Sequence, residues 1–233
     1  MTSRVQIPSD AAASLKSSRT SANRVAGDSS RWLVFLPRQP WATSAMLDLG
    51  GFYTQPLGQP LSATPPVFSF RELPSGVQTL GGIGFDVRGI VQLQGTNHVT
   101  IPVNRPCQRI HFLHAASNEA AGSRETVGIY QAAYASGERV KVELVNPQDL
   151  PPYQPTEFLR VSKGASTNAP AGLSRVFAWV GCTPDLARHD QALFLTRTTW
   201  TLPTSHNGEI VATLELQAGP SSSAPLVFAI TVE

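Results

Sequence analysis

Residues 73–95 constrain the fold of this chain more than any other stretch. The stretch begins with a Pro-Ser-Gly turn, passes the break at Gly81-Gly82 and then alternates apolar with polar side chains. The apolar members fall on one side and the polar members on the other: Phe85, Val87, Val91 and Leu93 against Asp86, Arg88, Gln92 and Gln94. Because successive side chains of a strand point to opposite faces, this period of two predicts one β-strand over residues 85–94 and does not fit a helical stripe.

Strand-like runs recur along the rest of the chain. Residues 127–135 and 138–145 predict a hairpin joined at Ser136-Gly137. Residues 109–115 are apolar on both faces apart from His111 and His114, which is typical of a central strand covered on both sides. Similar runs occupy residues 99–103, 175–182, 192–200, 210–216 and 226–232. With about ten strands and no amphipathic stretch of helical length, the sequence predicts an all-β fold, a β-sandwich of the jelly-roll type.

The length of 233 residues suits one such domain with an appendage. Residues 1–30 have the composition of a flexible basic tail, residues 31–44 that of a docking arm or linker, and residues 45–233 form the predicted sandwich domain. No signal-peptide h-region occurs in residues 1–26, and the apolar run 32–36 is too short to insert into a membrane. We therefore expect a cytoplasmic protein, or an extracytoplasmic one if the chain is part of a longer anchored protein.

Charge and motifs argue against several function classes. Eighteen basic against sixteen acidic side chains leave a net charge of +2, far from the basic footprint of a nucleic-acid-binding protein. Ser75 lacks the frame of a nucleophile elbow, and the glycines at 81–84 precede a strand rather than the helix that a phosphate loop requires. The sequence thus predicts that the protein is not an enzyme. The alternative is a hydrolase, which would need at least two acidic side chains in one pocket; the candidates are Asp86, Glu125, Glu143 and Glu157.

The cysteines and histidines predict no metal site. Cys107 and Cys182 lack metal-ligand spacing and could form one bridge or, the favoured alternative, pack as two buried thiols. His111 and His114 are three residues apart on a predicted strand, so their side chains point to opposite faces. We expect no cofactor, although no sequence spacing would mark a calcium ion held by loop carbonyls.

Seven short motifs, in a fixed order, resemble one bacterial family. They are LPSGVQT (73–79), GFDVRGIVQL (84–93), HFLHA (111–115), GIY (128–130), YASG (134–137), TW (199–200) and FAITVE (228–233). The family is an uncharacterised C-terminal β-sandwich domain that resembles galactose-binding-like jelly rolls. The resemblance covers roughly residues 40–233 and implies a non-catalytic accessory role; jelly-roll sugar modules often carry a structural calcium ion. One departure is the segment 145–153, where an aromatic-rich segment with a Trp pair is expected and Tyr153 stands alone.

Five residues are candidates for ligand binding. Asp86 and Arg88 share a strand face, where a carboxylate and a guanidinium could bind sugar hydroxyls; a structural ion pair is the more common role. Tyr130 and Tyr134 share a face of one strand and could line a groove, although sheet packing is the more common role. Tyr153 lies in the long loop 146–172, the predicted rim of such a groove.

These residues support two functions. The leading hypothesis is a non-catalytic recognition module that binds carbohydrate by aromatic stacking and polar side chains. The alternative is a structural or assembly protein that self-associates, as a homo-oligomer, or binds a protein partner through its arm. That arm would consist of Trp32, Leu33, Val34, Phe35 and Leu36.

Overall fold

The structure, a computed structural model, describes residues 22–23, 33–61, 68–95, 97–117, 125–145, 172–188 and 192–233. Within these residues nearly all regular elements are antiparallel strands, with one helical turn, α2 (Pro184–Ala187), and one 3-10 turn at Thr204–His206. The strands are β1 (Ala22–Asn23), β2 (Leu33–Val34), β3 (Gly76–Leu80), β4 (Ile83–Val87), β5 (Val91–Gln92), β6 (His98–Pro106), β7 (Arg109–Ala116), β8 (Thr126–Tyr134), β9 (Arg139–Val145), β10 (Leu173–Gly181), β11 (Leu193–Thr201), β12 (Ile210–Ala218) and β13 (Pro225–Val232). The predicted all-β fold is confirmed.

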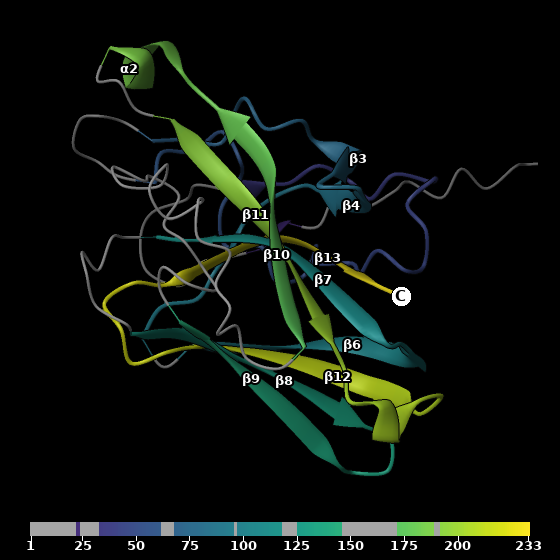
Figure 1. The fold of residues 1–233 in the computed structure, drawn as a ribbon. Coiled ribbons are helices and arrows are strands. Elements are labelled where there is room, and N and C mark those ends of the chain that lie inside the picture. Colours follow the sequence, from purple (N-terminus) through teal and green to yellow (C-terminus); the bar gives the residue numbers. More distant parts are fainter. Residues whose placement is uncertain are drawn as a thin grey trace, which may run out of the picture.

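Two large sheets form a β-sandwich (Figure 1). The first has five strands in the order β10-β11-β7-β13-β5, and the second has four in the order β6-β12-β8-β9. Apolar side chains from both sheets meet in one core between them, including Phe112 of β7, Tyr130 of β8 and Leu214 of β12. The two inner faces therefore bury each other, which is the usual way in which sheets of alternating pattern are stabilised.

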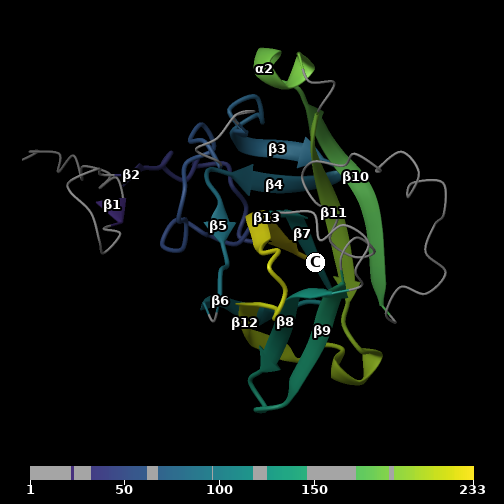
Figure 2. The same cartoon turned by 90° about the vertical axis from the view of Figure 1, so that its left-hand side faces the viewer.

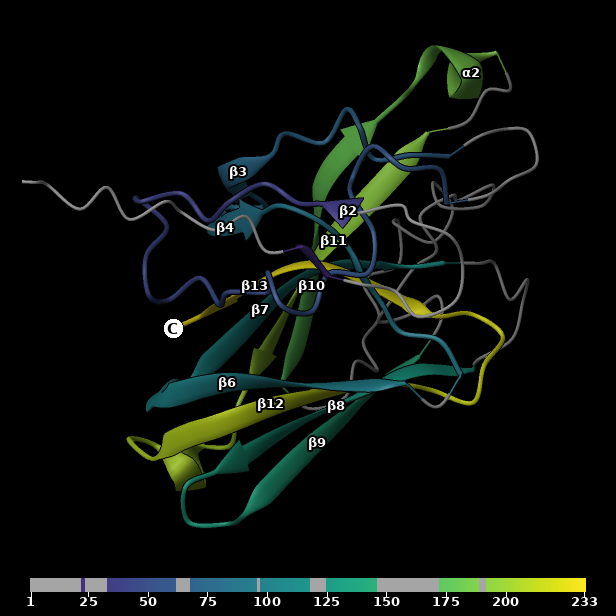
Figure 3. The same ribbon diagram turned by 180° about the vertical axis from the view of Figure 1, so that it is seen from behind.

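A third layer covers much of the outer face of the five-stranded sheet. Hairpin β3–β4 and the segments around residues 57 and 68–73 pack onto it in a second apolar core, which contains Phe70, Phe85 and Phe228. Figures 2 and 3 show the hairpin, the five-stranded sheet and the four-stranded sheet at successive levels. Every residue of β13, and every residue of β7 after Arg109, is consequently buried. The prediction of a central strand over residues 109–115 is confirmed.

The predicted single strand over residues 85–94 is wrong. Phe85 and Val87 end β4 in the outer core, whereas Val91 and Leu93 belong to the core between the sheets. The chain thus changes layer near Gly89, where a Cβ atom would lie only 2.8 Å from Cγ of Tyr53. A glycine allows this close approach, which a period-two pattern does not reveal.

The predicted hairpin is present as β8 and β9, whose turn contains Gly137 with a φ of 92°. Glycine adopts this left-handed conformation without steric cost, so the Ser-Gly pair fixes the turn and with it the register.

Candidate functional site

Asp86 and Arg88 are the buried members of a charged cluster that also contains the more exposed Arg38 and Asp48. The Nε atom of Arg88 lies 3.0 Å from Oδ2 of Asp86, and Nη1 of Arg38 lies 3.3 Å from the same oxygen. Arg88 also donates through Nη2 to Asp48. Asp86 is 2% exposed and Arg88 5% exposed, so neither is open to a sugar in solution. Their geometry is that of a structural ion network.

The charges within this cluster balance. Burial raises the pKa of Asp86, although the neighbouring Arg88 opposes this shift. Burial also acts to raise the pKa of Asp48, but the backbone N–H of Gly50 and the Arg88 guanidinium together lower it. Two guanidinium groups face two carboxyl groups, so the cluster carries no excess charge with which to bind an ion.

The arm, described from residue 33 to residue 44, packs against its own domain through inward-facing groups. Phe35 is buried, with its ring 5.5 Å from the ring of Tyr53. The backbone N–H of Val77 donates to Oε1 of Gln39 at 2.8 Å, which ties the arm to strand β3. Arg88 donates to the carbonyl oxygen of Leu36 at 3.3 Å. The charged cluster therefore also anchors the arm, through both Leu36 and Arg38.

The outward-facing side chains of the arm are apolar and exposed. Val34 is 69% exposed, Leu36 48% and Trp41 64%. Val34 and Leu36 alternate with buried Phe35, so one side of this short extended segment faces the domain and the other faces solvent. Val34 and Leu36 therefore form an exposed apolar patch, a feature that often marks an interaction surface, and Trp41 is a further exposed apolar side chain five residues along the arm. Trp32 lies outside the described residues.

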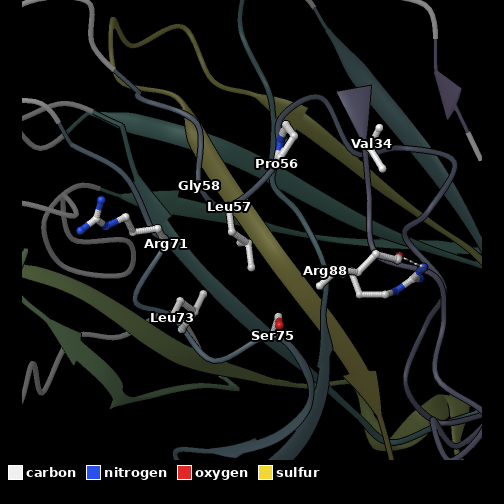
Figure 4. A pocket seen from close by; sticks show the side chains of 9 residues that line it. Val34, Pro56, Leu57, Gly58, Arg71, Leu73, Ser75 and Arg88 are labelled. Carbon is white, nitrogen blue, oxygen red and sulfur yellow. Dashed lines mark hydrogen bonds between the residues drawn. The ribbon is translucent and has the colours of Figure 1, made fainter. Parts of the chain in front are cut away.

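A pocket of about 250 Å³ opens beside this patch and is called the arm pocket below. Its lining residues are Val34, Leu36, Pro56, Leu57, Gly58, Arg71, Leu73, Ser75 and Arg88. In Figure 4, Leu57 and Leu73 lie between Arg71 on one side and Val34 and Arg88 on the other. The pocket thus has mainly apolar walls, and the side chain of Arg71 is 59% exposed at its edge.

The remaining predicted ligand residues do not join this pocket. Tyr130 is fully buried between the sheets, and its hydroxyl lies 3.2 Å from Nδ1 of His114. Tyr134 is 3% exposed, and its ring stacks on His206 at 4.3 Å. Both tyrosines pack in the core and present no face to solvent. Tyr153 lies outside the described residues, as does all of the predicted rim 146–172 except Gly172.

Burial keeps His114 neutral, and this predicts a specific pH dependence of stability. Burial, assisted by the charge of Arg175, lowers the pKa of His114 to about 3. The unfolded chain takes up a proton near pH 6.5 that the folded chain does not, so this histidine lowers stability as the pH falls from about 6.5 toward 3, by up to about 1.4 kcal/mol per pH unit. Urea unfolding at a series of pH values should show a shallower acid slope for His114→Gln; an unchanged slope contradicts this account.

Cys107 and Cys182 are not joined by a disulfide, and they differ in exposure. Cys107 is buried, as expected, whereas Cys182 is exposed just beyond strand β10, so the expectation of two buried thiols is wrong for Cys182. Burial raises the pKa of the Cys107 thiol to about 11, although nearby Arg105 opposes the shift. Because the thiolate is the reactive form, native protein at mildly alkaline pH should react with Ellman's reagent at Cys182 alone. Unfolded protein should react at both cysteines, and rapid labelling of Cys107 in the native state would contradict this assignment.

Within the described residues, no group of three or more His, Cys, Asp or Glu side chains could hold a metal ion. His111 contacts Thr199 and Glu233, whereas His114 contacts Tyr130 and Thr198 in the core between the sheets. In the described part of the chain, no helix has the length and apolar character needed to cross a membrane. Comparison with protein-family models, curated proteins and solved structures finds no match to this chain.

Sequence reasoning missed the pocket residues Leu57, Arg71 and Leu73, and it treated Trp41 only as one of several aromatic side chains that could stack on a ligand. These residues lie in segments of low periodicity, and only the chain's tertiary course brings them beside the arm. A large aromatic directly after Pro40, in a segment with no strand pattern, was the signal available for Trp41.

Proposed function

We propose that this protein is a non-catalytic recognition module that binds a protein partner through the arm's exposed patch and the arm pocket. The observation that carries this proposal is that Val34 and Leu36 are both exposed and line the pocket. Their backbone is held in place by Phe35 and by the hydrogen bond from Arg88 to the carbonyl oxygen of Leu36. An apolar surface that is already held in its binding conformation beside the arm pocket loses little conformational entropy when a partner binds.

The size and walls of the arm pocket favour one aromatic side chain as its occupant. Pockets for small molecules are usually larger, from about 300 to 1,000 Å³. Pro56, Leu57 and Leu73 supply apolar contact, and the Arg71 guanidinium at the edge could stack on an aromatic ring. Buried aromatic anchors of this kind typically contribute much of the energy of a protein interface.

Carbohydrate binding finds less support in this geometry. It would require exposed aromatic faces along a groove, and Tyr130 and Tyr134 are buried instead. Asp86 and Arg88 are occupied by Arg38, Asp48 and each other. Carbohydrate binding is accordingly the competing outcome of the experiment that follows.

The experiment is a titration of isotope-labelled full-length protein with N-acetyl-tryptophanamide, followed by two-dimensional NMR. We expect shift changes confined to amides around the arm pocket, including those of Leu36, Gly58 and Leu73. A parallel titration with galactose should leave these signals unmoved. Shift changes with galactose but none with the tryptophan derivative would overturn the proposal in favour of carbohydrate recognition.

We further propose that the sandwich has jelly-roll topology. The chain passes from β5 to β6, β7 and β8 by changing sheet at each step, and later strands insert between earlier ones. Strand β13 lies between β7 and β5, and β12 lies between β6 and β8. Two nested Greek keys generate this interleaving, and β10 adds one strand at the edge of the five-stranded sheet.

A further inference from the structure

Trp41 projects from a turn that the domain holds in place. The backbone N–H of Ala42 donates to the carbonyl oxygen of Gln39 at 3.0 Å, so Pro40 and Trp41 are the central residues of a β-turn. Arg38 donates through Nη2 to the carbonyl oxygens of Thr43 at 2.8 Å and Met46 at 2.7 Å. The side chain of Trp41 is nevertheless 64% exposed. An exposed tryptophan on a fixed turn is a suitable interface anchor, because little order is lost when it binds.

The arm pocket has a size and apolar walls that suit an aromatic side chain such as that of Trp41. Trp41 does not line the pocket of its own chain. Burying an aromatic side chain of this class removes about 150–250 Å² from water, which a single-residue pocket with apolar walls can provide. Arg71 remains exposed at the pocket edge while it pairs with Glu72 at 3.1 Å, and its guanidinium could also contact the face of an indole ring.

We infer that the partner is a second copy of this chain, with Trp41 of each copy seated in the arm pocket of the other. This inference rests on the proposed function and identifies the protein partner whose side chain fills the arm pocket. In a two-fold symmetric dimer both subunits use the same surface, so each subunit must present both the inserted side chain and the pocket that receives it. The arm and its neighbouring loops carry both. The net charge of +2 per chain opposes such pairing only weakly.

The test measures self-association of the full-length protein by sedimentation velocity over a wide concentration range. We expect a reversible dimer whose dissociation constant rises roughly thirty-fold in Trp41→Ala, the loss typical of an interface anchor. Gly58→Phe should have a similar effect by filling the pocket, because an added Cβ atom there meets only Cβ of Arg71, at 3.9 Å. The control is Ile210→Ala, which alters a 47% exposed apolar side chain on strand β12 and should leave the dimer unchanged.

Mixing the two variants tests the symmetry directly. A pair of Trp41→Ala and Gly58→Phe chains retains one intact tryptophan facing one intact pocket, so the mixture should associate more tightly than either variant alone. A mixture no tighter than its components would overturn the two-fold arrangement. Wild-type protein that stays monomeric, or Trp41→Ala that dimerises like wild type, would overturn the choice of a second copy. In either case the tryptophan-derivative titration still decides the proposed function separately.

Discussion

Arg88→Met is expected to lower the free energy of unfolding by about 3–5 kcal/mol, because it leaves a buried carboxyl group without its closest cation. Asp86 would keep only Arg38, 3.3 Å away, and its Oδ1 atom already has no hydrogen-bond partner among the described residues. Methionine retains most of the apolar stem of arginine, so the change tests the charge rather than the volume. Urea unfolding followed by circular dichroism measures the loss.

The matched control is Arg109→Met, which breaks the ion pair with Glu233 near the surface. The side chains of Arg109 and Glu233 are 56% and 45% exposed, and their closest atoms are 3.5 Å apart. Exposed pairs of this kind contribute at most about 1 kcal/mol. Equal losses of unfolding free energy for the two variants would contradict the account, because the charged cluster would then stabilise the arm and its domain no more than an exposed ion pair does.

Phe228→Ala is expected to cost about 3–5 kcal/mol, the usual penalty for removing a buried aromatic ring. Phe228 is fully buried on β13, and its ring meets that of Phe70 edge-on at 4.6 Å. Phe70 begins the segment that continues to Leu73, a wall of the arm pocket. The variant should therefore also weaken binding of N-acetyl-tryptophanamide at temperatures where the protein remains folded.

Ile210→Ala serves as the comparison, since an exposed substitution usually changes stability by less than about 0.5 kcal/mol. The two stabilities come from the same urea series, and probe binding comes from the NMR titration. A loss below 1.5 kcal/mol for Phe228→Ala, about half the lower expected value, would mean that the outer layer does not pack tightly against the five-stranded sheet.

The strands with a strong periodic pattern could be predicted from the sequence. β8 and β9 alternate cleanly around a Ser-Gly turn, and β7 is apolar on both faces because each face meets a different core. These signals are local, so a single sequence suffices to detect them.

The course of residues 85–94 could not be predicted, because the same alternation continues while the chain changes layer. Phe85 and Val91 look equivalent in the sequence but bury their side chains in different cores. The pairing of Asp86 with Arg88 was anticipated, whereas Arg38 and Asp48 come from distant segments that only the tertiary fold brings together.

The candidate site could likewise be predicted from the sequence only in part. The apolar run that ends at Leu36 identified the arm, and its alternation places Val34 and Leu36 opposite Phe35. The pocket depends on Leu57 and Leu73, whose surrounding segments carry no strand pattern and whose positions follow from packing on the five-stranded sheet. The tyrosines of β8 had a groove-lining pattern in sequence, but the facing sheet covers them.

The most direct test of the central claim compares N-acetyl-tryptophanamide binding to Val34→Ser/Leu36→Ser with binding to the control Ile210→Ser. If the arm's outer side forms the recognition surface, the double variant should bind at least about tenfold more weakly, a loss of about 1.4 kcal/mol. The control should bind like the wild type. Equal affinity for the double variant and the wild type would contradict the account, because binding would then not involve the two exposed residues that link the arm to its pocket.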